Sequence, residues 1–181
     1  MAFSMYPTID YQGSYCDMRM LASRKFDSLR ANARAGWIKA LFTGKWQMPS
    51  LSKRLAGRAI LGQHSLGLRS VEIERIVGTE SRARDFDADF NPRREHMRTR
   101  WARIAELELN QVTLPAVELI QVGDDYFVRD GHHRVSVARA LGCSFIDAQV
   151  TRVEVGEPMK ERKTDPAALR YAAGKYNGEI D

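Results

Sequence analysis

The feature that most constrains the fold of this chain is a strand that runs through a glycine straight into a helix. Residues Tyr126 to Arg129 are rich in aromatic and β-branched side chains and predict a strand, which ends at Asp130-Gly131. From His132 to Leu141 the apolar residues recur at helical spacing, and Gly142 follows where helices commonly end. A strand joined to a helix in this way predicts a domain in which helices cover a sheet.

The rest of the chain supplies further strands and helices for such a domain. A second strand, Val117 to Val122, precedes the first across a tight turn at Gly123-Asp124. We further expect strands at residues 69–76 and 146–153, helices at residues 17–41, 50–61, 92–109 and 165–173, and a surface loop at residues 77–87. The expected fold class is α+β, with a small mixed sheet flanked by helices and preceded by a basic N-terminal helical extension.

Three parts of the chain are expected. Residues 1–67 form the basic helical extension, in which residues 46–67 act as a connector, residues 68–153 form the α+β domain, and residues 154–181 form a charged tail. Within the domain, Asn91-Pro92 supplies an N-cap residue and a first helical proline. The helix that follows is expected to bury Met97, Trp101 and Ile104 against the sheet.

The positive charge of the chain is concentrated near its N-terminus. The formal net charge is +5, and residues 17–58 contain ten lysines or arginines against two aspartates. Such a concentration favours nucleic acid, an acidic protein surface or a membrane headgroup layer, although a solvated helix face produces the same pattern. The candidate nucleic-acid contacts are Arg24, Lys25, Arg30, Arg34 and Lys39.

Composition excludes several other classes of protein. No stretch approaches the roughly 18 to 20 apolar residues of a membrane span, and the N-terminal residues lack the features of a signal peptide. The two cysteines, Cys16 and Cys143, lie far apart and outside any zinc-ribbon or disulfide pattern. We therefore expect a cytoplasmic protein without membrane contact, in which Cys143 is a buried structural thiol.

The turn from Asp130 to Arg134 is the strongest candidate for a binding site. The first backbone N–H groups of a helix are free to bind an anion, and Gly131 allows a ligand to approach the backbone. His132 and His133 add titratable donors, and the guanidinium of Arg134 suits phosphate. Two other interpretations stay open: an ordinary turn with Asp130 as N-cap, and a metal site that combines these residues with His96 or His64.

This segment also resembles a known family. The run Tyr126-Phe127-Val128-Arg129-Asp130-Gly131-His132-His133-Arg134-Val135-Ser136-Val137-Ala138-Arg139-Ala140-Leu141-Gly142 resembles the phosphate-binding box of the ParB/sulfiredoxin superfamily. Residues 114–119 resemble the strand that precedes this box in ParB N-terminal domains, and residues 76–93 resemble the upstream loop of small bacterial ParB-like nuclease-domain proteins, so the resemblance extends over residues 68–153. It implies that Gly131, His132, His133 and Arg134 hold nucleotide phosphates, with Arg82 or Arg84 as the upstream partner.

The differences from that family argue against two of its functions. Sulfiredoxins carry their catalytic cysteine where this chain has His132, so sulfinic-acid reduction is not expected. Partition ParB proteins place a glutamate and an arginine at His132 and His133, and they continue into a helix-turn-helix and a dimerisation domain. This chain is expected to lack both, so a full centromere-binding clamp is not expected.

Four functions follow from these features. The first is a ParB-like domain that binds, and in one version hydrolyses, a nucleoside triphosphate on or near DNA, with or without Mg²⁺. The second is a ParB-like nuclease, in which His132 or His133 is a general base or metal ligand. The third is a small-molecule kinase or phosphotransferase that uses Glu80, Asp85 or Glu118, and the fourth is a non-catalytic interaction module. The identity of the nucleotide, the metal requirement and the presence of a homodimer are left open.

Overall fold

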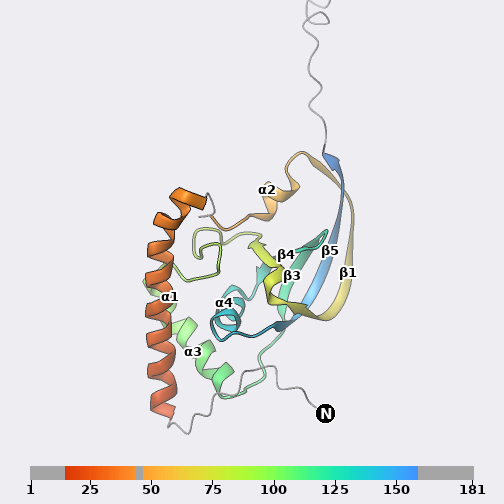
Figure 1. The fold of residues 1–181 in the computed structure, drawn as a ribbon. Coiled ribbons are helices and arrows are strands. Elements are labelled where there is room, and N and C mark those ends of the chain that lie inside the picture. The colour runs from red at the N-terminus through yellow and green to blue at the C-terminus, as the bar shows by residue number, and fades with distance from the viewer. Residues whose placement is uncertain (1–14, 44–46, 159–181) are drawn as a thin grey trace, which may run out of the picture.

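A computed structural model describes residues 15–43 and 47–158, and for residues 15–17, 37–43 and 158 it describes the backbone alone. One five-stranded sheet forms the centre of the molecule, in the order β1-β5-β3-β4-β2 (Figure 1). The strands are β1 (Arg58–Glu72), β2 (Ile76–Thr79), β3 (Val117–Val122), β4 (Asp125–Asp130) and β5 (Phe145–Pro158). β3 runs antiparallel to β4 and parallel to β5, so the sheet is mixed and the expected α+β fold class is confirmed.

Three helices cover one face of this sheet. Figure 1 shows α1 (Tyr15–Thr43) alongside α3 (Arg98–Leu109), with α4 (His132–Ala140) between these helices and the strands. Trp101 of α3 is fully buried, its ring lies 5.8 Å from that of Phe26 in α1, and its indole nitrogen donates to Ser136 of α4 at 2.9 Å. One aromatic side chain therefore connects three helices.

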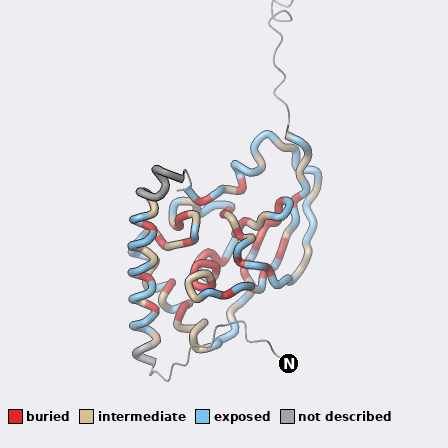
Figure 2. The backbone as a smooth tube through the Cα atoms, in the orientation of Figure 1, coloured by how far each residue is buried: buried red, intermediate tan, exposed pale blue. Residues whose placement is uncertain are grey.

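The opposite face of the sheet has a smaller core. Ile120, Val122, Phe127 and Val153 are buried there against Leu51 of α2 (Leu51–Leu55). Because side chains alternate between the two faces of a strand, burial on both faces explains the almost continuous apolar run of β3. Figure 2 shows the buried positions gathered in the inner strands and α4, with buried and exposed positions alternating along α1.

The hairpin and the helix after it have nearly the predicted bounds. β3 spans residues 117–122 as expected, β4 is one residue longer at each end, and α4 ends at Ala140 before Gly142, whose φ is 76°. The N-terminal helix is also confirmed. The strand expected at residues 146–153 is the middle of the longer β5.

The expected connector at residues 46–67 is wrong in part. The short helix α2 ends at Leu55, not Leu61, and β1 begins at Arg58 directly after Gly57, whose φ is 70°. Pairing with β5 along its length holds β1 in place through backbone hydrogen bonds, while most of its side chains are exposed. A strand without a buried face lacks the alternation that would identify it in the sequence.

The single strand expected at residues 69–76 is also wrong. The chain leaves β1 at Glu72, makes a 3₁₀ turn at Ile73–Arg75 and enters β2, whose residues 77–79 were expected to be loop. β1 and β2 lie at opposite edges of the sheet, so the stretch that was expected to form one strand contributes to two. The break is therefore required by the topology.

The helix expected from Pro92 begins later. A 3₁₀ turn at Glu95–Met97 precedes α3, which starts at Arg98. Asn91 does not cap this helix, because its backbone and side-chain N–H groups donate to the carboxylate of Asp87 at 2.8 and 2.9 Å. Met97 and Trp101 are buried as predicted, while Ile104 is only half-buried.

The last two expectations concern the C-terminal segment and a membrane-spanning helix. The helix predicted at residues 165–173 lies outside the described residues. Within the described ranges, no helix has both the length and the apolar character that a membrane span requires.

Candidate phosphate-binding site

Gly131 shapes the start of α4. It is the N-cap residue with a φ of 92°, and a Cβ placed there would lie 2.5 Å from Cγ1 of Val117. No side chain caps the helix, and the first intrahelical bond runs from the amide of Val135 to the carbonyl of Gly131 at 3.0 Å. The N–H groups of the first turn therefore have no intrahelical acceptor and are available to an anion.

A small hollow of about 40 Å³ lies at this helix start. Besides the sequence-predicted residues Asp130 to Arg134, it is lined by Arg82, Arg100 and Ile104. A single water needs roughly 10 to 15 Å³ by the same measure, so the hollow admits one compact group such as a phosphate. Any base and sugar attached to that phosphate would have to lie outside it.

The two candidate upstream arginines are separated by the structure. Arg82 lines the hollow, with its Nη1 3.4 Å from a carboxylate oxygen of Asp85, and its side chain is largely exposed. Arg84 is exposed and is not part of the lining. Arg100 lines the hollow where Arg84 does not: it lies one helical turn before Ile104 and shares its face of α3. Among the described residues, Arg100 has no ion-pair partner.

His132 is held inside the protein. Only 3% of it is exposed, its Nε2 lies 2.6 Å from Oγ1 of Thr79, and its ring stacks on Phe86. Burial, together with the positive charge of Arg82, lowers the pKa of His132 to about 4. His132 is therefore neutral near pH 7, whereas the sequence suggested a titratable cation.

His133 is neutral for a similar reason. Burial and the charge of Arg100 lower the pKa of His133 to about 4. Its Nδ1 is buried without a hydrogen-bond partner among the described residues, and its ring meets the edge of Phe86 at a centroid distance of 5.5 Å. The positive charge of the site therefore comes from arginines alone.

The guanidinium of Arg134 forms most of its hydrogen bonds within the protein. Its Nη1 donates to the carbonyls of Pro115 and Ala116, the latter at 3.0 Å, and its Nη2 donates to Asp130 at 2.9 Å. Only 15% of its side chain is exposed. Arg134 thus fastens the start of α4 to the segment that enters β3, and Asp130 is its ion-pair partner instead of a helix cap.

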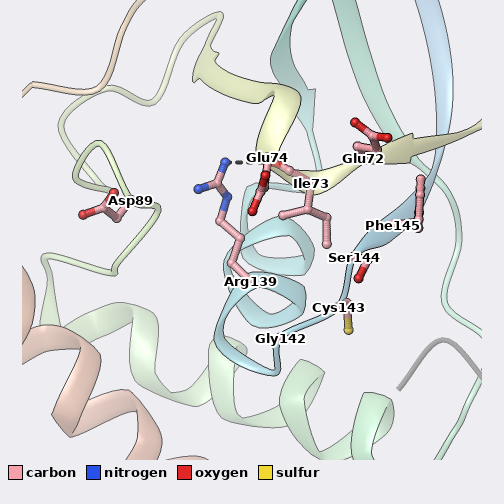
Figure 3. A pocket seen from close by; sticks show the side chains of 9 residues that line it. All are labelled: Glu72, Ile73, Glu74, Asp89, Arg139, Gly142, Cys143, Ser144 and Phe145. Atoms are coloured by element: carbon pink, nitrogen blue, oxygen red, sulfur yellow. Dashed lines mark hydrogen bonds between the residues drawn. The ribbon is translucent and has the colours of Figure 1, made fainter. Parts of the chain in front are cut away.

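A larger hollow of about 590 Å³ lies near the other end of α4 (Figure 3). Three carboxylates line it, those of Glu72, Glu74 and Asp89, against the single guanidinium of Arg139. Nη2 of Arg139 already donates to the carbonyls of Ile73 and Ile76 at 2.9 and 2.6 Å. This hollow opposes anions, so the smaller one is the candidate for phosphate.

Cys143 lies beside the larger hollow and is buried, as expected for a structural thiol. Burial and the nearby charge of Glu108 raise the pKa of its thiol to about 11. Because the thiolate is the reactive form, this thiol is not activated at neutral pH.

The five candidate nucleic-acid contacts in α1 separate into three groups. Arg24, Lys25 and Arg34 are exposed, outside the face that buries Ala22, Phe26 and Ala33. Arg30 pairs with Glu95, so it joins α1 to the turn before α3 and is not free for nucleic acid. The side chain of Lys39 lies outside the described residues.

The metal interpretation finds no support in the described part of the chain. No group of three or more His, Cys, Asp or Glu side chains converges there in a way that would hold a metal ion. His64 in particular lies on β1, where it is 3.8 Å from Glu154.

Comparison with known proteins gives one distant likeness. No protein-family model matches the chain, and no curated protein matches it. Among solved structures, the crystal structure of sulfiredoxin from Arabidopsis thaliana is similar, with 19% sequence identity and a TM-score of 0.31, over 59% of this chain and 96% of that chain.

Proposed function

We propose that this chain binds the phosphate of a nucleotide at the start of α4. The observation that carries the proposal is the uncapped helix start, which opens into a hollow of phosphate size beside Arg100. Free N–H groups, the positive end of the helix dipole and a guanidinium then act on the same anion. The ParB-like sequence of the turn supports a nucleotide as the ligand, with its base outside the hollow.

The charges around the hollow favour an anion. Arg82, Arg100 and Arg134 line it against the one carboxylate of Asp130, and the two histidines add no charge near pH 7. As neutral imidazoles they can each still donate one N–H to a phosphate oxygen. A phosphate therefore meets a net positive surface without the repulsion that two imidazolium groups would exert on the arginines.

Binding is a better match to these residues than catalysis by histidine. A general base works best when its pKa is near the working pH, and the pKa of both histidines is lowered to about 4. His132 also shares its Nε2 with Thr79. We therefore propose a nucleotide-binding domain, with hydrolysis as a further property to be measured as phosphate release.

The proposal extends to DNA through α1. Arg24, Lys25 and Arg34 are exposed on the outer part of this helix and suit sequence-independent contact with a phosphate backbone. The nucleotide site and α1 are linked physically, because α1 packs on α3 and α3 carries Arg100.

A thermal-shift panel tests the nucleotide proposal. ATP, CTP, GTP, UTP and their diphosphates are compared with and without Mg²⁺, and we expect at least one of them to raise the melting temperature. Mg²⁺ is included as a variable because the described residues hold no ready-made metal cluster, so the phosphates themselves would supply most of its ligands.

The variant Arg100→Ala tests whether the nucleotide binds at this hollow. Loss of a charge-assisted hydrogen bond should weaken the affinity for the selected nucleotide roughly tenfold or more, measured by calorimetry. Arg103→Ala is the matched control, because it removes an exposed arginine of the same helix that does not line the hollow. Equal affinity in Arg100→Ala and wild type, or no ligand in the whole panel, would contradict the proposal.

A further inference from the structure

Thr79 connects three segments of the candidate site through one hydroxyl group. It ends β2 and is fully buried. Its Oγ1 lies 2.6 Å from Nε2 of His132 in α4, 3.2 Å from the amide nitrogen of Ser81 and 3.0 Å from that of Arg82. The carbonyl oxygen of Val128 in β4 is a fourth neighbour, at 3.4 Å.

The hydrogen-bonding capacity of a hydroxyl decides the direction of these bonds. A threonine hydroxyl accepts two hydrogen bonds and donates one. The amides of Ser81 and Arg82 can only donate, so they fill both acceptor positions. If His132 also donated to this oxygen, three donors would compete for two lone pairs.

The hydroxyl proton therefore has two acceptors to choose from. The carbonyl of Val128 is distant at 3.4 Å and already accepts the amide of Glu80 at 2.9 Å. Nε2 of His132 is much closer, at 2.6 Å. The hydroxyl donates to His132, and the neutral imidazole accordingly carries its own proton on Nδ1.

Two residues that line the phosphate hollow are thus held by the same oxygen atom. Arg82 and His132 line that hollow, and each is bonded directly to the Thr79 hydroxyl, Arg82 through its backbone. We propose that Thr79 is a positioning residue of the phosphate site, which fixes the loop of Arg82 and the ring of His132 in one arrangement. This inference rests on the proposed phosphate binding.

The backbone of Thr79 is held independently of its hydroxyl. Its amide donates to the carbonyl of Pro49 at 2.9 Å, and it pairs with Val128 in the parallel β2–β4 ladder. Valine has the same branched shape and suits a strand equally well. Thr79→Val therefore removes the hydroxyl while the strand contacts stay, and Thr79→Ser keeps the hydroxyl.

Calorimetry with inorganic pyrophosphate on the full chain tests the role of this hydroxyl. We expect Thr79→Val to lose about tenfold in affinity, because Arg82 and His132 lose their common anchor, and Thr79→Ser to stay within about threefold of wild type. Thr113→Val makes the same change at an exposed position and should leave affinity unchanged. A wild-type affinity in Thr79→Val would overturn the positioning role alone, even if the melting temperature fell. If the wild type binds a nucleotide of the panel but not pyrophosphate, that nucleotide replaces pyrophosphate in the same comparison. Binding of neither would overturn the proposed function and this inference with it.

A measurement on the wild type covers the case in which Thr79→Val does not fold. Nitrogen-15 NMR at neutral pH distinguishes the protonated from the unprotonated ring nitrogen of a neutral histidine. We expect His132 to show an unprotonated Nε2 and a protonated Nδ1. A proton on Nε2 would overturn the inference, because the hydroxyl could then not donate to this ring.

Discussion

His132 and His133 are adjacent in the first turn of α4, and burial keeps both imidazoles neutral near pH 7. This matters for binding, because a cation at the start of a helix opposes the helix dipole. Neutral rings avoid that cost. The charge that attracts a phosphate comes instead from Arg82 and Arg100, which approach from a loop and from another helix.

The lowered pKa values predict a stability that depends on pH. In the unfolded chain the histidines take up protons near pH 6.5, whereas in the folded chain they do so near pH 4. Between these values the unfolded state binds more protons, so the free energy of unfolding should fall as the pH falls from 6.5 to 4. A full shift of this size corresponds to about 3 kcal/mol for each histidine.

Urea denaturation at several pH values measures this slope. In His133→Gln the contribution of His133 disappears, so the curve between pH 4 and 6.5 should be flatter than in the wild type. Comparing the two proteins cancels the opposite contribution of Asp87, whose pKa is raised by burial and whose contribution to stability is lost as the pH rises. Equal slopes would mean that folding does not lower the pKa of His133.

Gly131 can be tested by adding a single methyl group. Its positive φ disfavours any side chain, and a Cβ would also meet Val117 at 2.5 Å, so Gly131→Ala should cost about 2 to 4 kcal/mol of stability. Gly123→Ala is the matched control, because Gly123 has a φ of 63° with nothing within 4 Å of its Cβ position. Its cost should be the backbone strain alone, about 1 kcal/mol. Equal costs measured by denaturation would argue against the contact with Val117.

At the scale of elements, the sequence was most informative where local signals agree. The segment from Val117 to Gly142 combines a tight turn, a glycine before a helix and a glycine after it, and its strands and helix have nearly the predicted bounds. The errors occur where long-range pairing decides the structure. β1 pairs with β5, which lies far away in the sequence at the other end of the domain. Asn91 donates to Asp87 instead of capping α3. No local sequence pattern reveals either interaction.

The residues of the candidate site also divide into those with a local sequence signal and those brought in by long-range packing. Gly131 to Arg134 were found because they are consecutive in the sequence, and their place at a helix start is confirmed. Arg100 and Thr79 belong to other elements and reach the site only through the packing of α3 on α4 and the pairing of β2 with β4. Arg100 is one of several arginines in α3, so the sequence does not distinguish it from its neighbours, and a buried threonine gives no signal at all.

Trp101 provides a prediction for the packing of α1, α3 and α4. Removing the indole leaves a cavity between the helices and leaves Ser136 without its partner, so Trp101→Ala should cost about 3 to 5 kcal/mol. Trp101→Phe keeps most of the packing and loses the N–H group, so it should cost about 1 to 2 kcal/mol. Denaturation curves measure both. A loss below about 1 kcal/mol in Trp101→Ala would mean that the three helices do not depend on this side chain.

At the scale of the whole molecule, α1 is both a packing element and the carrier of exposed charge. Its inner face supplies Phe26 to the core, and its Asp27 and Arg30 form ion pairs with Arg98 and Glu95. Deleting α1 would therefore expose Trp101 and disturb the helix that carries Arg100. A test of DNA binding has to change the outer charges while the inner face stays in place.

The triple variant Arg24→Ala, Lys25→Ala and Arg34→Ala meets this requirement, because all three side chains are exposed and alanine preserves the helix. If these residues bind DNA phosphates, the logarithm of the affinity for a short DNA duplex should depend less steeply on the logarithm of the salt concentration. The slope should fall by about 0.9 for each phosphate that the variant no longer neutralises, or roughly 2 to 3 in total. Arg69→Ala removes an exposed arginine from β1 and should leave the slope unchanged. Fluorescence anisotropy over a range of salt concentrations gives these slopes, and a triple variant with the wild-type slope would place any DNA-binding surface elsewhere on the molecule.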